Sequence, residues 1–141
     1  MNDIDLRTGR HCVFMLHCHL IFITKYRGKT LNNEVLSFIE GVMRDIAAGF
    51  EVEITEFNGE SDHIHLLINY PPKVSLSKLI NSLKGVSSRK VRQNFPDVRY
   101  HWTNKNTGAL WSPSYFAGSI GGAPLEVLKR YIEQQDRPHK Q

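Results

Sequence analysis

The stretch Asp62-His63-Ile64-His65-Leu66-Leu67-Ile68-Asn69-Tyr70 decides how this chain is expected to fold. Its apolar residues alternate, so that Ile64, Leu66 and Ile68 share one face of a strand. Pro71-Pro72 then ends the strand, because proline has no backbone N–H to give to a sheet. We therefore predict a strand over 62–70 with its apolar face on the core and both histidines on the opposite face.

Periodic segments on both sides of this strand complete an α+β pattern. Further strands are predicted at 13–25, 50–57 and 115–120, and helices at 32–48, 76–93 and 124–135. This order is typical of a ferredoxin-like or RRM-like split βαβ antiparallel sheet with helices on one face, here followed by an added C-terminal helix. We expect a single domain over 1–141 in which strands 13–25 and 62–70 are central neighbours. The sheet face away from the helices would carry His17, His19, Glu51, Glu53, His63 and His65.

Three local expectations accompany this fold. In strand 50–57, alternation puts Phe50, Val52 and Ile54 on the core side. Asn58-Gly59 is expected to begin a turn after that strand. Gly85 is expected to interrupt helix 76–93, since glycine weakens helices.

Composition excludes several classes of protein. The chain has 141 residues, of which 40% are hydrophobic and 23% charged, which suits one soluble globular domain and not a disordered or fibrous chain. We expect no membrane span, since no window approaches 18 uncharged apolar residues, and no signal peptide at the N-terminus. The two cysteines, Cys12 and Cys18, favour a reducing cytoplasm.

Positive charge is concentrated in one segment. The net charge of the chain is +4, but residues 73–105 hold eight basic residues and one acidic residue, so this segment carries +7 and the remainder −3. Such a distribution is typical of nucleic-acid binding, although a solvated basic helix face explains it as well. The cations taken as candidate DNA contacts are Lys25, Arg27, Lys73, Lys84, Arg89 and Arg92. The candidate stacking aromatics are Tyr26, Tyr100, Trp102 and Trp111, for each of which core packing is the alternative.

The histidine pair is a candidate metal site. Alternation places His63 and His65 on one face, about 6.6 Å apart along the strand, which one metal ion can bridge. Two ordinary sheet histidines would show the same pattern. Asp62 is placed to orient an imidazole as an outer partner, or simply to end a turn.

The predicted last helix carries a possible nucleophile. Tyr131 and Gln135 are four residues apart and therefore share a helix face, where one offers a hydroxyl nucleophile and the other a hard oxygen ligand. A half-buried packing role for Tyr131 is the alternative. Gly121-Gly122 precede the helix and would let it move as a unit, or serve an ordinary loop.

Together these motifs run through nearly the whole chain in a specific order. They are His19 to Lys25-Tyr26-Arg27, Asp62 to Leu67, Pro71-Pro72-Lys73, Leu83-Lys84-Gly85 with Ser87-Ser88, Leu110 to Tyr115, and Tyr131-Ile132 with Gln135. In this order the chain resembles the small single-tyrosine HUH transposases of bacterial insertion sequences, the insertion-sequence-two-hundred-like group.

The resemblance implies a function and its residues. Tyr131 would be the nucleophile and His63, His65 and Gln135 the ligands of Mg²⁺ or Mn²⁺. The substrate would be single-stranded DNA with hairpin ends, cleaved and rejoined through a 5′-phosphotyrosine. The resemblance further implies a homodimer with composite active sites, in a bacterial or archaeal cytoplasm and without a membrane partner.

Two alternatives stay open from the sequence. A domesticated relative would cut host hairpin repeats without moving an element, and its genomic neighbourhood would distinguish it. A non-catalytic nucleic-acid-binding module on the same sheet would need exposed aromatic residues on the central strands, where this sequence has His63 and His65.

Overall fold

Four antiparallel strands form the main sheet, in the order β4 (Glu53–Gly59), β5 (His63–Asn69), β3 (His17–Ile23) and β6 (Phe116–Ser119). The computed structural model describes residues 6–9, 11–25, 29–98, 109–119 and 125–134, with side chains from residue 130 onward in the last of these segments. The two central strands are β5 and β3, which confirms the predicted split βαβ arrangement.

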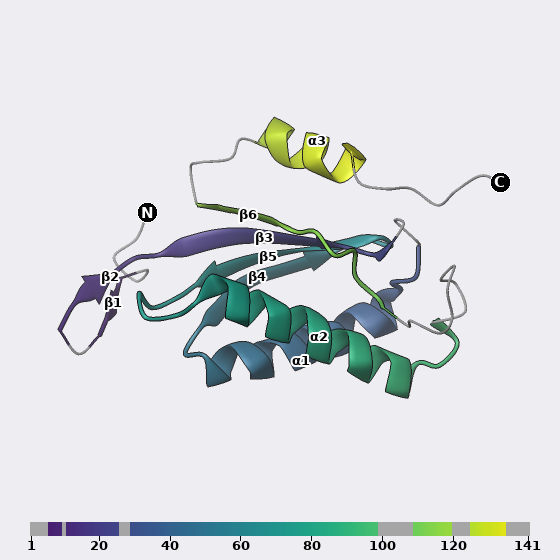
Figure 1. Cartoon of the computed structure of the whole chain (residues 1–141), viewed down its shortest axis with the longest axis horizontal. Helices are drawn as coiled ribbons and strands as arrows, with labels where there is room; N and C mark the ends of the chain where they lie inside the picture. Colours follow the sequence, from purple (N-terminus) through teal and green to yellow (C-terminus); the bar gives the residue numbers. More distant parts are fainter. Residues whose placement is uncertain (1–5, 10, 26–28, 99–108, 120–124, 135–141) are drawn as a thin grey trace.

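Two long helices cover one face of this sheet and a short helix lies over the other (Figure 1). Helix α1 (Asn33–Gly49) and helix α2 (Leu76–Asn94) pack against each other beneath the sheet, and α3 (Leu125–Gln134) lies on the opposite side. The long helices begin at side-chain caps, where Asn32 accepts from the backbone N–H of Val35 and Ser75 from that of Lys78. These caps satisfy backbone donors that the first turn of a helix leaves unpaired.

The hydrophobic core lies between the sheet and the two long helices. Alternate residues of the central strands point into it and are fully buried, and each such side chain contributes about 1.5–3 kcal/mol of transfer free energy. These residues are Leu20, Phe22, Ile64, Leu66 and Ile68. From the helices, Val35, Ile39, Met43, Leu79, Ile80 and Leu83 complete it.

The predicted strand 13–25 is divided in the structure. Strand β2 (Val13–Phe14) pairs with β1 (Arg7–Thr8) in a separate two-stranded ribbon, and the main-sheet strand begins only at His17. The cause lies in the neighbouring strand β5, which is followed by Pro71-Pro72. The N–H of Tyr70 makes the last bond, to the carbonyl of Leu16 at 3.0 Å, and the prolines offer no further donor.

Strand β4 contains a β-bulge that alternation did not predict. Ile54 pairs with Ile68 and Glu56 with Leu67, so Thr55 is an extra residue without a partner in the ladder. The strand also begins at Glu53 and includes Asn58-Gly59, so the expected turn there was wrong. The turn follows one residue later, where the N–H of Glu60 bonds the carbonyl of His63 at 2.8 Å.

Two further observations complete the fold. Helix α2 continues through Gly85 to Asn94, so the expected interruption is wrong. A Cβ added at Gly85 would have no atom within 4 Å, so this residue lies at an open position on the helix surface. Within the described part of the chain, no helix is both long and apolar enough to cross a membrane.

Candidate active site on the histidine face

The sheet face turned away from α1 and α2, here called the histidine face, presents both predicted metal ligands. His63 and His65 point to it as half-buried residues, while Ile64 between them is fully buried in the core. The predicted placement of the pair is therefore confirmed. Nδ1 of His63 lies 2.8 Å from Oδ1 of Asp62, so the carboxylate preceding the pair orients the first imidazole.

The second imidazole is held by a third histidine. His19 of β3 places its Nδ1 2.8 Å from Nε2 of His65, and the planes of the two rings are inclined by only 13°. The sequence places His19 and His65 on one face of neighbouring strands, but it does not give the register that brings these residues, 46 positions apart, into contact. Same-face residues on neighbouring central strands are the signal that points to such a pair.

Burial disfavours the charged form of His65. Burial is the largest influence that lowers the pKa of the His65 imidazole from its ordinary value of 6.5, and the neighbouring His19 lowers it further. The Glu56 carboxylate acts in the opposite direction, and His63 adds a smaller lowering effect. A neutral imidazole has a lone pair available for a metal ion.

The bulge at Thr55 brings Glu56 to the histidine face. After the bulge Glu56 pairs with Leu67 and Asn58 with His65, so both polar side chains share the face of the histidines. Uninterrupted alternation from Ile54 would have turned Glu56 towards the core instead. The bulge therefore adds an acidic residue whose charge acts on His65, and the sequence pattern did not predict it.

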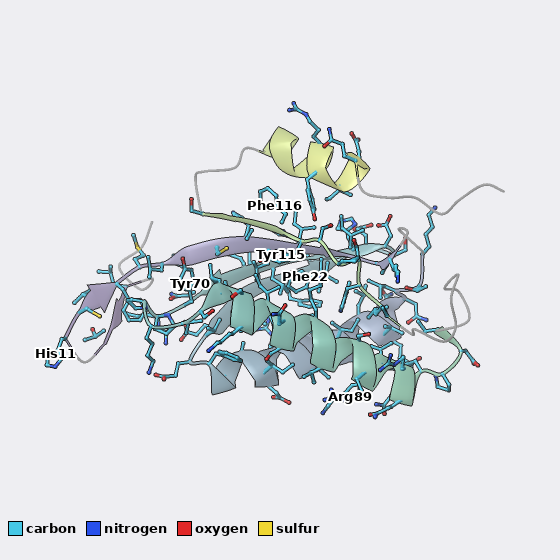
Figure 2. All side chains as sticks on the ribbon, in the orientation of Figure 1. His11, Phe22, Tyr70, Arg89, Tyr115 and Phe116 are labelled. Carbon is cyan, nitrogen blue, oxygen red and sulfur yellow. The ribbon has the colours of Figure 1, made fainter. Side chains whose placement is uncertain are left out.

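Helix α3 places Tyr131 over the same face. Tyr131 packs against Ile21 and Ile23 of β3, and its ring centroid lies 5.4 Å from that of Phe116. Phe116 projects from β6 towards α3 (Figure 2). Ile21 is paired across the sheet with His65, and Ile23 with His63. The predicted nucleophile and the two predicted ligands therefore share one small area of the sheet.

The Tyr131 hydroxyl is in a poor environment for ionisation. Its oxygen is buried and has no hydrogen-bond partner of standard geometry among the described residues. Burial raises the pKa of this hydroxyl above 10.0, and Ser114 opposes this only in part. Burial in this position therefore disfavours the ionised form of Tyr131.

The residue types at this site suit a divalent cation in part. Two imidazoles on one face are ligands for Mn²⁺ and related metals. No third His, Cys, Asp or Glu in the described segments joins them to form a group that holds a metal. The predicted third ligand, Gln135, lies outside the described residues. The described residues thus fit a two-histidine site that needs a ligand from elsewhere.

Lys84 has partners within its own chain. Its ammonium donates to the carbonyl oxygens of Ser112 at 2.7 Å, Pro113 at 3.1 Å and Ser114 at 3.3 Å. It also lies 5.5 Å from the ring centroid of Tyr115, and burial lowers its pKa from 10.5. The geometry therefore gives Lys84 the role of holding segment 112–114, while its predicted DNA contact stays a prediction.

The same helix face holds the residues before that segment. The indole N–H of Trp111 donates to the Ser87 hydroxyl at 2.9 Å, and the backbone N–H of Leu110 donates to Ser88 at 3.0 Å. Trp111 is only 4% exposed and its ring belongs to the core, so of its two expected roles the structure shows core packing and not base stacking. Helix α2 thus fixes the chain that leads into β6 and towards Ser114.

The remaining predicted DNA contacts are scattered. Arg89 is exposed on α2 and Arg92 is half-buried. Lys73 is exposed and pairs with Glu51, which has a φ of 60° and lies outside β4. Lys25 follows β3, where its backbone N–H bonds the Leu110 carbonyl at 2.9 Å. Outside the described residues lie Arg27, Tyr26, Tyr100 and Trp102.

Comparison with known proteins assigns the class. Residues 12–135 match the family model described as "Transposase IS200 like". The chain therefore belongs to the IS200-like transposase family.

Two curated relatives are similar over most of their length. The chain is 31% identical over 132 residues to the ISDra2 transposase TnpA of Deinococcus radiodurans, a match that covers 94% of this chain and 92% of that protein. It is 29% identical over 131 residues to the transposase of insertion sequence element IS200 from Salmonella typhimurium, covering 93% and 84%.

Solved structures agree with this fold. A crystal structure of a protein assigned as a transposase in Deinococcus radiodurans superimposes with a TM-score of 0.81 at 32% identity, covering 94% of this chain and 99% of that one. A REP-associated tyrosine transposase bound to a REP hairpin superimposes with a TM-score of 0.57 at 10% identity, covering 90% and 68%. The latter likeness concerns the fold alone.

Proposed function

We propose that this transposase cleaves and rejoins single-stranded DNA at hairpin-bearing ends, with a divalent metal and a 5′-phosphotyrosine intermediate. One observation carries the proposal. Tyr131 packs on Ile21 and Ile23, whose partners across the sheet are His65 and His63. A hydroxyl nucleophile and a pair of metal-ligating side chains on one face are the parts that phosphoryl transfer by a tyrosine requires.

The Tyr131 hydroxyl is a weak nucleophile while it is protonated, so the scissile phosphate has to be made more reactive. His63 and His65, with Gln135 as the predicted third ligand, would hold a Mg²⁺ or Mn²⁺ ion, which would neutralise charge at the scissile phosphate. Attack by Tyr131 forms the bond from its oxygen to phosphorus and breaks the bond to the 3′ oxygen. The tyrosine proton is released and the departing 3′ oxygen gains one. The covalent link conserves the phosphodiester, so a second 3′-OH can reverse the reaction without ATP.

DNA is the partner that the family membership supports. The solved relative with a REP hairpin has the same fold, and the basic segment 73–105 supplies positive charge on and after α2. Among the predicted contacts, Arg89 is exposed on α2 and suited to phosphate binding. We include Lys25, Arg27, Lys73 and Arg92 in the proposed DNA surface, and give Lys84 a supporting position beneath it.

The proposed assembly is a homodimer with composite sites. In the present position the Tyr131 hydroxyl is buried and its pKa is raised, which suits storage of the nucleophile better than reaction. We infer that α3 leaves this position and that Tyr131 of one chain then serves His63 and His65 of the other. A shared site keeps an isolated monomer from cutting DNA and ties the two ends together.

The test of the function uses oligonucleotides taken from the DNA that flanks the gene. Single strands that carry a terminal hairpin and a 3′ label are incubated with the protein and Mn²⁺, then separated on a denaturing gel. We expect a labelled covalent protein–DNA band that EDTA abolishes and that a strand without the hairpin does not give. Absence of the band with every flanking hairpin, or its full formation in EDTA, contradicts the proposal.

The dimer is tested separately by complementation. Tyr131→Phe and His63→Ala chains are co-expressed with different tags and purified as heterodimers. One composite site of such a heterodimer keeps both intact parts, so we expect part of the cleavage to return. Heterodimers that are as inactive as both parents, although each variant folds and dimerises, contradict the shared site and favour assembly within one chain.

A further inference from the structure

The two imidazoles of the His-x-His pair are held by different kinds of partner. Asp62, the preceding residue, contacts Nδ1 of His63 at 2.8 Å. His65 is contacted from a different strand, by Nδ1 of His19 at its Nε2, also at 2.8 Å. Metal-binding histidines in proteins almost always use their other ring nitrogen in such a contact, which fixes the ring. A carboxylate such as that of Asp62 is a usual partner that fixes the ring of a metal-binding histidine. His19 contacts the ring of His65 as Asp62 contacts the ring of His63.

The sheet fixes the position of His19. Its neighbours Cys18 and Leu20 point to the opposite face and are 4% and 0% exposed, so the backbone at His19 is anchored in the core. His19 pairs across the strands with Leu67, which makes His65 its diagonal neighbour. Diagonal neighbours on one face are within reach of long side chains. His19 therefore reaches His65 from a rigid central strand.

The ring geometry shows a hydrogen bond rather than face-to-face stacking. The planes differ by 13° and the centroids are 5.0 Å apart, yet the two nearest nitrogens are only 2.8 Å apart. Those nitrogens therefore lie between the two rings, edge to edge. One imidazole donates an N–H and the other accepts with its lone pair, so the protonation pattern of each ring depends on the other.

We propose that His19 is a positioning residue of the metal site, which orients the ring of His65 through the bond between Nδ1 of His19 and Nε2 of His65. The inference rests on the proposed function, because it concerns the ligand pair of that site. His19 acts through His65 and is not itself a third ligand, since no three such side chains in the described segments are grouped to hold a metal. Its role towards His65 is that of Asp62 towards His63.

The chain offers a matched control two residues away. His17 lies on the same strand and the same face, is 9% exposed, and has no hydrogen-bond partner at either ring nitrogen among the described residues. His17→Phe removes an imidazole of β3 without removing a bond to the metal site. His19→Phe removes an imidazole together with the bond to His65. His19→Asn keeps a polar group close to the position of Nδ1.

The experiment measures the dissociation constant of Mn²⁺ by electron paramagnetic resonance, without DNA, for the wild type and the three variants. We expect His19→Phe to bind about 10- to 100-fold more weakly, as is typical when an outer partner of a ligand is lost. His19→Asn should recover most of the loss and His17→Phe should bind as the wild type does. Thermal unfolding of each variant shows whether it is folded.

Two outcomes separate failure of the inference from failure of the proposed function. A wild-type protein that does not bind Mn²⁺ overturns the proposed metal site and the inference with it. A wild type that binds, with His19→Phe equal to it or tighter, overturns the inference alone. If His19→Phe does not fold, ¹⁵N spectra of the metal-free wild type provide the test instead. Spectra in which the ring nitrogens of His19 and His65 share no hydrogen bond also overturn the inference.

Discussion

The two faces of the sheet are made by alternate residues of the same strands, yet they differ in almost every physical respect. On the helix side, Leu20, Phe22 and Leu66 are fully buried in an apolar core. On the histidine face, His63 and His65 are half-buried and bonded to other polar groups, and the apolar cluster found there among the described residues is the small one around Ile21 and Ile23. The helix side stabilises the fold, and the histidine face carries the residues of the proposed site.

The difference between the two faces shows how a chain of this size positions the proposed active site. His63 and His65 are placed by β5, a central strand that is hydrogen-bonded to β3 on one side and to β4 on the other. The two proposed ligands therefore need no cavity of their own, since the sheet already fixes their spacing. Stability and activity are then expected to respond to substitutions on different faces.

The largest expected effect on activity comes from the histidine face. Replacing His63 or His65 with alanine should lower DNA cleavage by about 100-fold or more, beyond the range typical of losing an outer partner of a ligand. The free energy of unfolding should fall by about 1 kcal/mol or less, because both side chains are only half-buried. Cleavage rates and denaturant titrations measure the two quantities, and cleavage at the wild-type rate would make the pair merely structural.

The helix side should show the opposite response. Leu66→Ala removes a fully buried side chain from the core and should lower the free energy of unfolding by about 2–5 kcal/mol. At a temperature where the variant is folded, its cleavage rate should stay near that of the wild type. A loss of cleavage in a fully folded Leu66→Ala protein would show that the two faces are not separable.

A smaller effect is expected in the pH dependence of stability. The fold lowers the pKa of His65 from 6.5, chiefly by burial, so near and below that pH the unfolded chain binds more protons at this residue. The stability that His65 contributes is present above pH 6.5 and is lost as the pH falls through the lower pKa of the folded state. Denaturant titrations from about pH 5 to about pH 7.5 should therefore show a flatter profile for His65→Phe than for the wild type. Identical pH profiles for the wild type and His65→Phe would contradict a lowered pKa of His65 in the folded protein.

The smallest effect concerns the cations of α2. Arg89→Ala should reduce the slope of log affinity against log salt by about 0.7, the value for one phosphate contact on single-stranded DNA. Lys84→Met should leave that slope unchanged and destabilise the fold, because the carbonyls of Ser112, Pro113 and Ser114 lose their common donor. Affinities of both variants between low and high salt give the slopes. A reduced slope for Lys84→Met alone would restore the lysine to the DNA surface.

Periodicity alone predicted most of this fold. The apolar alternation around Ile64 gave a central strand, the stripes of two helices gave the layer beneath it, and the same alternation put His63 and His65 on one face. These features depend on which residues must leave water, and that information is local in the sequence.

The features that periodicity missed depend on contacts between distant residues. The sequence near Thr55 does not predict the bulge that places Glu56 on the histidine face, because the bulge is defined by the pairing of β4 with β5. The His19–His65 bond joins two strands. Lys84 points inward because its ammonium donates to three backbone carbonyls that lie 28 to 30 residues later in the chain. A lysine pattern by itself does not distinguish an exposed cation from one that holds a loop.

The most direct test of the central claim is the attachment point of DNA on the protein. Tyr131→Phe removes only a hydroxyl that makes no hydrogen bond of standard geometry in the described structure, so the variant should fold and bind hairpin DNA as the wild type does. With Mn²⁺ and hairpin-bearing single strands, mass spectrometry of the wild-type adduct should place the nucleotide on the peptide that contains Tyr131, and Tyr131→Phe should give no adduct. An adduct of Tyr131→Phe that forms at the wild-type rate, or a nucleotide mapped to another residue, would contradict the account.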